Sequence, residues 1–164
     1  MSSYIIYADG ACLGNGSSFA RAGWGATLTN PQGDTLDIAG PVPDGEPQTN
    51  GRAELQAALE ALRRCSKPVP ITVYTDSELV AKGCNEWLPG WKTRGWKKAD
   101  KKAPEHLDLW KLLDLEMQTK DIRIEWVKAH SGIPGNERAD RLAGIGATGK
   151  KIYKLTRKAV EATG

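Results

Sequence analysis

The sequence predicts an α/β fold in which five strands form one mixed sheet with helices on both faces. Three strand-like segments come first, and their connections are too short for crossovers, which indicates an antiparallel meander. Two later strand-like segments alternate with amphipathic helical segments, so these strands can run parallel to the first. The chain has 164 residues, 40% hydrophobic and 26% charged, which suits one globular domain.

The strands are predicted from β-rich runs that are bounded by turn residues. A glycine-rich turn follows the first run, and the turn at residues 30–33 separates the second run from the third. Pro68 and Pro70 interrupt the chain before the fourth run. The predicted strands cover residues 4–9, 21–29, 34–39, 71–75 and 122–127.

The helices are predicted from apolar residues at helical spacing. Leucine and alanine residues repeat in this way after Asn50, the predicted N-cap of the first helix. A further helix is predicted over residues 104–118, where Pro104 suits the first turn. The last helix begins near a second predicted cap, Asn136, and short helices are expected over residues 77–87.

Composition excludes several classes of protein. No apolar run approaches the roughly 18 residues of a membrane span, and the first residues lack the basic and apolar regions of a signal peptide. Cys12, Cys65 and Cys84 form neither an even disulfide set nor a Cys-x-x-Cys pair, so we expect free thiols. The expectation is a soluble, cytoplasmic monomer without a membrane or an obligate protein partner.

Basic residues cluster in two segments although the net charge is only +3. Basic segments beside an acidic site suit a polyanion held for metal-dependent attack. The first segment, called the basic ridge below, comprises Lys92, Arg94, Lys97, Lys98, Lys101 and Lys102. The second is the tail after Gly149, where Ile152, Leu155, Ala159 and Val160 predict a short amphipathic helix.

Four acidic residues stand at the ends of predicted elements. Asp9 and Asp76 close two strands that could be neighbours in this topology. Glu54 opens one amphipathic stretch and Asp140 lies early in another. Strand ends and helix starts meet at the rim of an α/β sheet. Four oxygen donors there favour Mg²⁺ or Mn²⁺, and two such ions about 3.5–4 Å apart can promote phosphodiester hydrolysis.

Each acid taken alone also has a simpler interpretation. Asp9 or Asp76 could be a turn former, Glu54 a partner of the helix dipole, and Asp140 a solvated surface residue. Their joint placement at the ends of different elements is what favours a metal site.

Histidine and tryptophan residues add two further signals. His130 lies in a loop with nearby glycines, where a mobile imidazole could deprotonate the attacking water or move a proton at product departure. Trp87, Trp91 and Trp96 flank and interleave with the basic ridge. They either pack its base or stack on nucleic acid, and the basic residues either track phosphates or form a solvated face. We favour the phosphate-tracking interpretation.

The chain resembles type 1 ribonuclease H in four motifs that follow the order found in the family. They are YADGACLGN at residues 7–15, TNGRAEL at 49–55, TDS at 75–77, and WVKAHSG…NERAD at 126–140. The basic ridge, followed by LDLW, is similar to the basic protrusion of bacterial members. The resemblance covers about residues 4–147.

This resemblance implies the ribonuclease H fold and endonucleolytic cutting of the RNA strand of RNA/DNA hybrids, leaving 5′-phosphate and 3′-hydroxyl ends. It implies two Mg²⁺ ions during catalysis, with Mn²⁺ as a substitute. Residues 1–148 would be the ribonuclease H domain, and residues 149–164 a basic extension. The implied metal ligands are Asp9, Glu54, Asp76 and Asp140, and His130 is the implied proton-handling residue. The implied hybrid contacts are Cys12, Asn15, Thr49, Asn50, Trp91, Lys92, Arg94, Lys97 and Lys98.

Three positions depart from the family pattern. Gly51 and Glu78 replace amides that contact substrate in many bacterial members, and His106 replaces a polar residue. Other classes of protein explain the sequence less well. A non-cleaving binding module would have lost a carboxylate ligand, and the chain is too short for a reverse transcriptase. A structural interaction protein leaves the placement of the acids unexplained.

Overall fold

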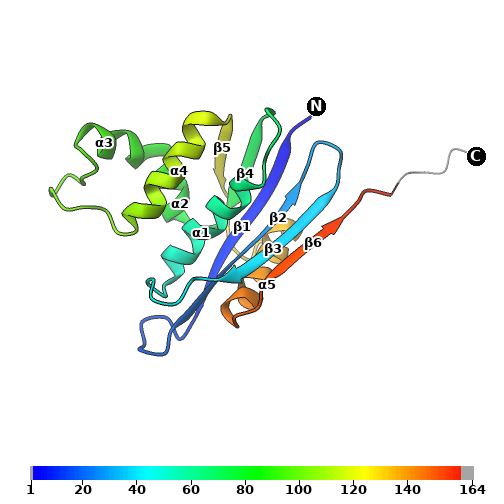
Figure 1. The fold of residues 1–164 in the computed structure, drawn as a ribbon, viewed down its shortest axis with the longest axis horizontal. Coiled ribbons are helices and arrows are strands. Elements are labelled where there is room, and N and C mark those ends of the chain that lie inside the picture. Colours follow the sequence, from blue (N-terminus) through cyan, green and yellow to red (C-terminus); the bar gives the residue numbers. More distant parts are fainter. Residues whose placement is uncertain (1, 160–164) are drawn as a thin grey trace, which may run out of the picture.

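The computed structural model describes residues 2–159 and contains one six-stranded mixed sheet (Figure 1). The strands lie in the order β5-β4-β1-β2-β3-β6. β1, β2 and β3 form the predicted antiparallel meander, and β4 and β5 run parallel to β1. The strands are β1 (Tyr4–Leu13), β2 (Arg21–Thr29), β3 (Thr35–Pro41), β4 (Ile71–Thr75), β5 (Ile122–Trp126) and β6 (Ile152–Thr156).

Helices cover both faces of the sheet, and two glycines show which helix lies on which face. Gly10 is paired with Trp24 and shares its face, and a Cβ on Gly10 would lie 2.5 Å from the backbone nitrogen of Glu54 in α1. Gly25 follows Trp24 and therefore points to the other face. A Cβ there would lie 2.3 Å from the backbone nitrogen of Ala143 in α5. The helices are α1 (Asn50–Arg63), α2 (Glu78–Lys82), α3 (Leu88–Thr93), α4 (Leu107–Thr119) and α5 (Pro134–Ala147), with a π-helical turn at Gly83–Trp87.

The main core lies between the sheet and the layer formed by α1, α2, α3 and α4. Ile6 and Val73 from the sheet, Leu59 from α1 and Trp110 from α4 are all buried in it. Alternation in the strands and the i, i+3, i+4 spacing in α1 place these residues on the facing sides. Within residues 2–159, no helix is both long enough and apolar enough to cross a lipid bilayer.

The tail differs from the sequence prediction, because residues 152–156 form a sixth strand and not a short helix. β6 pairs antiparallel with β3, with Ile38 opposite Tyr153, and satisfies backbone groups at that edge of the sheet. Its apolar side chains remain outside the core, since Tyr153 is 69% exposed and Leu155 is 48% exposed. Backbone pairing therefore decides the conformation of the tail, and Val160 lies outside the described residues.

The helix caps also differ from the prediction. Thr49, and not Asn50, caps α1, and its Oγ1 accepts a hydrogen bond of 3.1 Å from the backbone N–H of Arg52. The N-cap of α5 is Ile133, so Asn136 lies inside the first turn of that helix and is buried. Both helices still begin within a few residues of the predicted position, so their acidic residues keep the expected places.

Candidate active site

The parallel pairing of β1 with β4 brings Asp9 and Asp76 to one rim of the sheet. Ala8 lies opposite Thr75 in the register, and the two aspartates directly follow this pair. Asp9 is only 7% exposed. The predicted neighbourhood of these two strand ends is therefore confirmed, and it places two carboxyl groups where the sheet meets the helices.

α1 supplies Glu54 to the same rim. The helix approaches closely because Gly10 has no side chain, and any Cβ there would collide with the backbone of α1. Burial raises the pKa of Glu54, a hydrogen bond from the Ser77 hydroxyl lowers it, and the charge of Asp76 raises it. The net effect is a raised pKa because burial outweighs the hydrogen bond from Ser77, and Glu54 lies beyond the first turn of α1, where the helix dipole acts most strongly.

α5 brings Asp140 to the site from the opposite face of the sheet. The helix lies directly on β2, where a Cβ on Gly23 would be 1.9 Å from the backbone nitrogen of Ala147. Burial and the negative charges of Asp76 and Asp140 raise the pKa of Asp9 to about 8. The charges of Asp76 and Asp140 thus act on Asp9, and the charge of Asp76 acts on Glu54, so the four predicted acids lie near one another.

This crowding bears on whether the site suits a metal ion. Within residues 2–159, no three acidic, histidine or cysteine side chains are arranged as a ready metal site. The coupling between the acids nevertheless shows strong mutual repulsion, and a divalent cation is the usual way to offset it. Carboxylate side chains can rotate toward a cation, whereas strand pairing fixes the backbone positions of Asp9 and Asp76, so the site can still close around a metal ion. The all-oxygen donor set fits Mg²⁺ or Mn²⁺ better than zinc.

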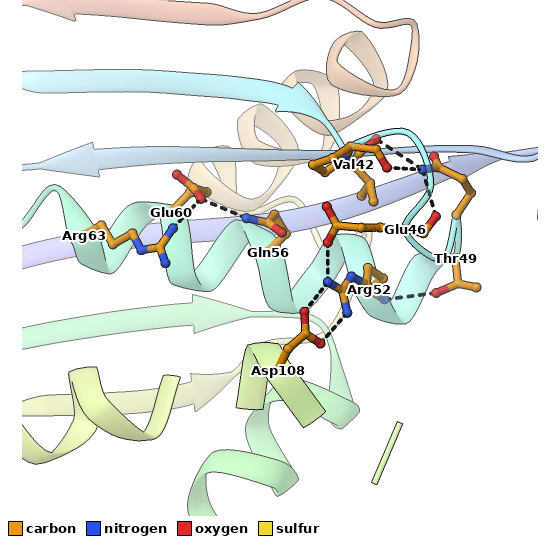
Figure 2. A network of polar contacts seen from close by, with 10 residues as sticks. Val42, Glu46, Thr49, Arg52, Gln56, Glu60, Arg63 and Asp108 are labelled. Carbon is orange, nitrogen blue, oxygen red and sulfur yellow. Dashed lines mark hydrogen bonds and ion pairs between the residues drawn. The ribbon is translucent and has the colours of Figure 1, made fainter. Parts of the chain in front are cut away.

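The N-terminal end of α1 is held by a buried arginine that sequence analysis missed (Figure 2). The Arg52 guanidinium donates to both carboxylate oxygens of Asp108 in α4, at 2.8 and 2.6 Å, and also pairs with Glu46. Arg52 is 3% exposed. Its spacing from Leu55 and Leu59 puts a charged residue in the apolar stripe of the helix. That interruption was the available signal for a buried ion pair.

His130 lies on the loop that connects β5 to α5, the helix that carries Asp140. The residue is exposed and has a left-handed backbone, with φ 54°. Gly132 beside it also has a positive φ, 83°. The fold therefore places the imidazole on a turn that leads directly into the acidic helix, while its mobility stays a prediction.

Comparison with known proteins agrees with this geometry. The chain matches the RNase H family model over residues 1–148. The chain belongs to the ribonuclease H family. Ribonuclease H of Cupriavidus pinatubonensis is 49% identical over 146 residues, which cover 89% of this chain and 96% of the relative. Ribonuclease H of Ralstonia nicotianae is 44% identical over 163 residues and covers 99% of both chains.

Solved structures support the same assignment. LC9-RNase H1, described as a type 1 RNase H with the type 2 active-site motif, is 28% identical with a TM-score of 0.81, covering 96% of this chain and 78% of that one. LC11-RNase H1, solved with an RNA/DNA hybrid, shares the fold at 22% identity, with a TM-score of 0.63, over 88% of this chain and 96% of that one. The activity of this ribonuclease H is degradation of RNA in RNA/DNA hybrids, and the family is metal-dependent. The predicted family, fold class and enzyme class are confirmed.

The basic ridge of this ribonuclease H lies on α3 and on the loop that leads to α4. Lys92 pairs with Asp114 of α4 at 3.2 Å, and Lys98 pairs with an acid of its own loop at 3.8 Å. Arg94 donates to the backbone carbonyl of Lys97 at 3.2 Å. Within residues 2–159, Arg94 and Lys97 take part in none of the ion pairs, and both are exposed. These two cations, like the exposed Lys101 and Lys102 of the same loop, are well placed to meet a phosphate.

Trp91 packs at the base of the ridge, and its contact with substrate stays a prediction. It is 6% exposed, and its ring meets Trp110 edge-on with centroids 5.2 Å apart. Trp87 lies 5.8 Å from it, as their four-residue spacing predicts. Burial of the Trp91 and Trp110 rings stabilises the base of the ridge. The exposed cations of the ridge therefore stand on a packed base.

Cys12 and the start of α1 form the other predicted contact surface. Cys12 lies inside β1, and not in the predicted turn, and its Sγ donates to the backbone carbonyl of Gln48 at 3.3 Å. Asn15 is exposed on the loop that follows β1, and Thr49 and Asn50 begin α1. These residues therefore gather at the end of the sheet that carries the acids.

The departures from the family pattern fall beside this surface. A Cβ on Gly51 would lie 3.7 Å from Nε2 of His106, and both residues line a hollow of about 330 Å³. His106 has a left-handed backbone, φ 61°, so α4 begins only at Leu107, later than predicted. Burial and the positive charge of Arg52 lower the pKa of His106, which favours its neutral form. Glu78 is exposed and 3.7 Å from a lysine of its own helix.

Proposed function

We propose that this ribonuclease H cuts the RNA strand internally with two Mg²⁺ ions held by its four carboxylates, leaving 5′-phosphate and 3′-hydroxyl ends. Mn²⁺ would substitute for Mg²⁺. The observation that carries the proposal is the parallel register of β1 and β4, which brings Asp9 and Asp76 to one rim of the sheet beside Glu54 of α1. The raised pKa of Asp9, about 8, agrees with it, because burial and the charges of Asp76 and Asp140 penalise its ionisation. A cation at this rim reverses that penalty. The proposed ligands are Asp9, Glu54, Asp76 and Asp140.

The proposed role of each residue in metal binding depends on how firmly the fold holds its side chain. When bound, the ions would activate a water and stabilise the leaving oxygen. Asp9 in β1 and Asp76 after β4 belong to paired strands, which supports a role in fixing the position of the cations. The Ser77 hydroxyl orients the Glu54 carboxylate. Asp140 is exposed on α5, which suits a ligand that adjusts as substrate enters.

His130 is the proposed proton-handling residue. Its exposed place on the loop before α5 supports this role, because an accessible imidazole can accept a proton from water or pass one to the departing oxygen. The positive φ of His130 and Gly132 shapes the turn without strand or helix hydrogen bonds. This leaves the side chain free to approach or leave the rim.

The hybrid would lie across the rim between two surfaces. Cys12, Asn15, Thr49 and Asn50 are the proposed contacts near the cut, where 2′-hydroxyl groups distinguish RNA from DNA. The basic ridge, through Lys92, Arg94, Lys97 and Lys98, would hold the phosphates of the DNA strand. The exposed positions of Arg94 and Lys97 support this division.

Replacing Asp76 with asparagine tests the proposal. Asp76→Asn keeps the size of the side chain but removes one negative ligand, so cleavage of a labelled hybrid in Mg²⁺ should fall at least about 100-fold. Asp121→Asn is the matched control, since Asp121 is an exposed carboxylate before β5, at the opposite end of the parallel strands from Asp76, and should retain near wild-type cleavage. Equal activity of Asp76→Asn and wild type would remove Asp76 from the metal site. End analysis of the products tests the predicted 5′-phosphate.

We further propose that residues 1–148 form the complete catalytic domain, with residues 149–164 as an accessory extension of a monomeric protein. The family match over residues 1–148 supports this boundary. Cys12, Cys65 and Cys84 are free thiols, which supports the expected location in a reducing cytoplasm.

A further inference from the structure

The loop between β1 and β2 exposes the one phenylalanine of the chain. Phe19 is 87% exposed, more than any other large hydrophobic residue among those described. A single exposed apolar side chain is common in proteins and indicates little by itself. Two further features indicate a binding role for Phe19: the hydrogen bonds that shape its loop, and a hollow beside its ring.

Hydrogen bonds within the β1–β2 loop fix its shape. The Ser17 hydroxyl donates to the backbone carbonyl of Gly14 at 2.7 Å, and the backbone N–H of Phe19 donates to that hydroxyl at 3.2 Å. Gly14 has a positive φ of 64°, which lets the chain turn directly after β1. The phenyl ring is therefore carried by a hydrogen-bonded loop, and this loop loses little conformational entropy when the ring contacts a ligand.

A hollow of about 500 Å³ adjoins the ring and is joined to the proposed substrate surface. Gln48 lines the hollow, and its Oε1 accepts a 2.8 Å hydrogen bond from the backbone N–H of Ala22. The backbone carbonyl of the same Gln48 accepts from Cys12, and the next residue is Thr49, the cap of α1. A strand bound over Cys12 and Thr49 thus continues directly into this hollow.

The position of the hollow indicates which strand it meets. It lies at the end of the sheet, lined by Ala147 and Gly149 near the end of α5 and by Gln48 from the segment before α1. Figure 1 shows the β1–β2 loop projecting past the end of the sheet, apart from α3 and α4. The start of α1 separates the hollow from the basic ridge, since Gln48 lines this hollow while Thr49 and Lys98 line the one beside the ridge. If the ridge holds the DNA strand, this side meets the RNA strand.

The chemistry of the lining agrees with RNA. Asp44 on the wall carries a carboxylate, and Arg21 carries the opposite charge at the start of β2. A carboxylate repels a phosphate, but it accepts a hydrogen bond from a 2′-hydroxyl, which DNA lacks. An aromatic ring beside it can stack on a base or cover a sugar.

We propose that Phe19 and the hollow beside it form an auxiliary contact for the RNA strand, beyond the nucleotides at the cut. The contact rests on the proposed function, because that function sets the path of the hybrid. It extends the binding surface without adding a catalytic residue. Its consequence is tighter binding of hybrids that are long enough to reach the loop.

Steady-state cleavage in Mg²⁺ of a hybrid of about 20 base pairs tests the contact. Loss of one stacked base should raise KM about 5- to 10-fold for Phe19→Ala, while kcat stays within about twofold because the acids are untouched. Phe19→Tyr should restore the wild-type KM. Leu155→Ala is the control, since Leu155 is an exposed apolar residue, 48% accessible, on β6.

The outcomes separate the two proposals. An unchanged KM for Phe19→Ala overturns the contact, and so does an equal rise for Leu155→Ala or a failure of Phe19→Tyr to restore KM. Thermal unfolding of each variant checks that the fold is intact, and a Tm lowered in Phe19→Ala but not in Phe19→Tyr would assign the ring a structural role and reject the contact. The metal assignment is judged separately by Asp76→Asn, whose loss of kcat does not depend on Phe19.

Discussion

Replacing Arg52 with methionine should destabilise the protein by about 2–3 kcal/mol. The change removes the charge but keeps an unbranched apolar stem in the buried site, where the arginine side chain is 4% exposed. It eliminates two hydrogen bonds to Asp108, at 2.8 and 2.6 Å, and the ion pair with Glu46. Figure 2 shows these contacts joining the loop before α1, α1 itself and α4.

The size of this loss in stability follows from how exposed the partners of Arg52 are. A hydrogen bond to a charged group contributes about 1.5–3 kcal/mol. The Asp108 side chain is 63% exposed, so water hydrates it once the arginine is gone. Nε of Arg52 is buried and without a partner among the described residues, which reduces the net value of the network. Both facts favour the lower end of this energy range for each hydrogen bond. The total loss in stability corresponds to a Tm lower by roughly 5–10 °C.

Arg63→Met in the same helix is the matched control. Arg63 also pairs with a glutamate, Glu60, at 3.0 Å, but its side chain is 42% exposed. Such a pair contributes about 0.2–0.5 kcal/mol. Urea unfolding of wild type, Arg52→Met and Arg63→Met, followed by circular dichroism, measures the difference.

Two results would refute this reasoning. Equal small losses for Arg52→Met and Arg63→Met would mean that burial of the arginine adds nothing to its ion pairs. A gain in stability for Arg52→Met would mean that desolvation of the guanidinium costs more than its partners return, as happens in some buried ion pairs.

Three further predictions concern the acids, the close helix contact and the tail. The pKa of Asp9 is raised from 3.8 to about 8, so the native state binds the proton more tightly and the metal-free fold loses stability as pH rises through that range. Asp9→Asn should therefore unfold at higher urea than wild type in EDTA at pH 8, by at least about 1 kcal/mol, with no difference near pH 3. Gly25→Ala should lower stability by about 2 kcal/mol or more in thermal unfolding, because its Cβ would lie 2.3 Å from the backbone of α5, whereas Gly144→Ala in the open part of α5 should be neutral or stabilising. A chain ending at Gly149 should lose only about 1 kcal/mol and keep kcat on short hybrids, because β6 buries almost none of its side chains; loss of kcat there would place the tail in the active site.

The elements that carry the acids could be predicted because their signals are local. Alternating β-rich residues ended by Asp9 and by Asp76 mark two strand ends, and the spacing after residue 50 marks the helix with Glu54. Motif order then identified the family, which the comparisons confirmed. The site residues stay predictions from those motifs, since each acid belongs to a motif of its own.

The sequence by itself thus determined the fold class, the family and the four elements that hold the acids. Only the tertiary structure decided the features that depend on distant partners. Residues 152–156 became a strand because the edge of β3 lies beside them, and Trp91 was buried by Trp110. Arg52 found Asp108, 56 residues further along the chain. The pKa of Asp9 likewise depends on burial and on charges from other elements, because desolvation and Coulomb interactions act through space and leave no local pattern in the chain.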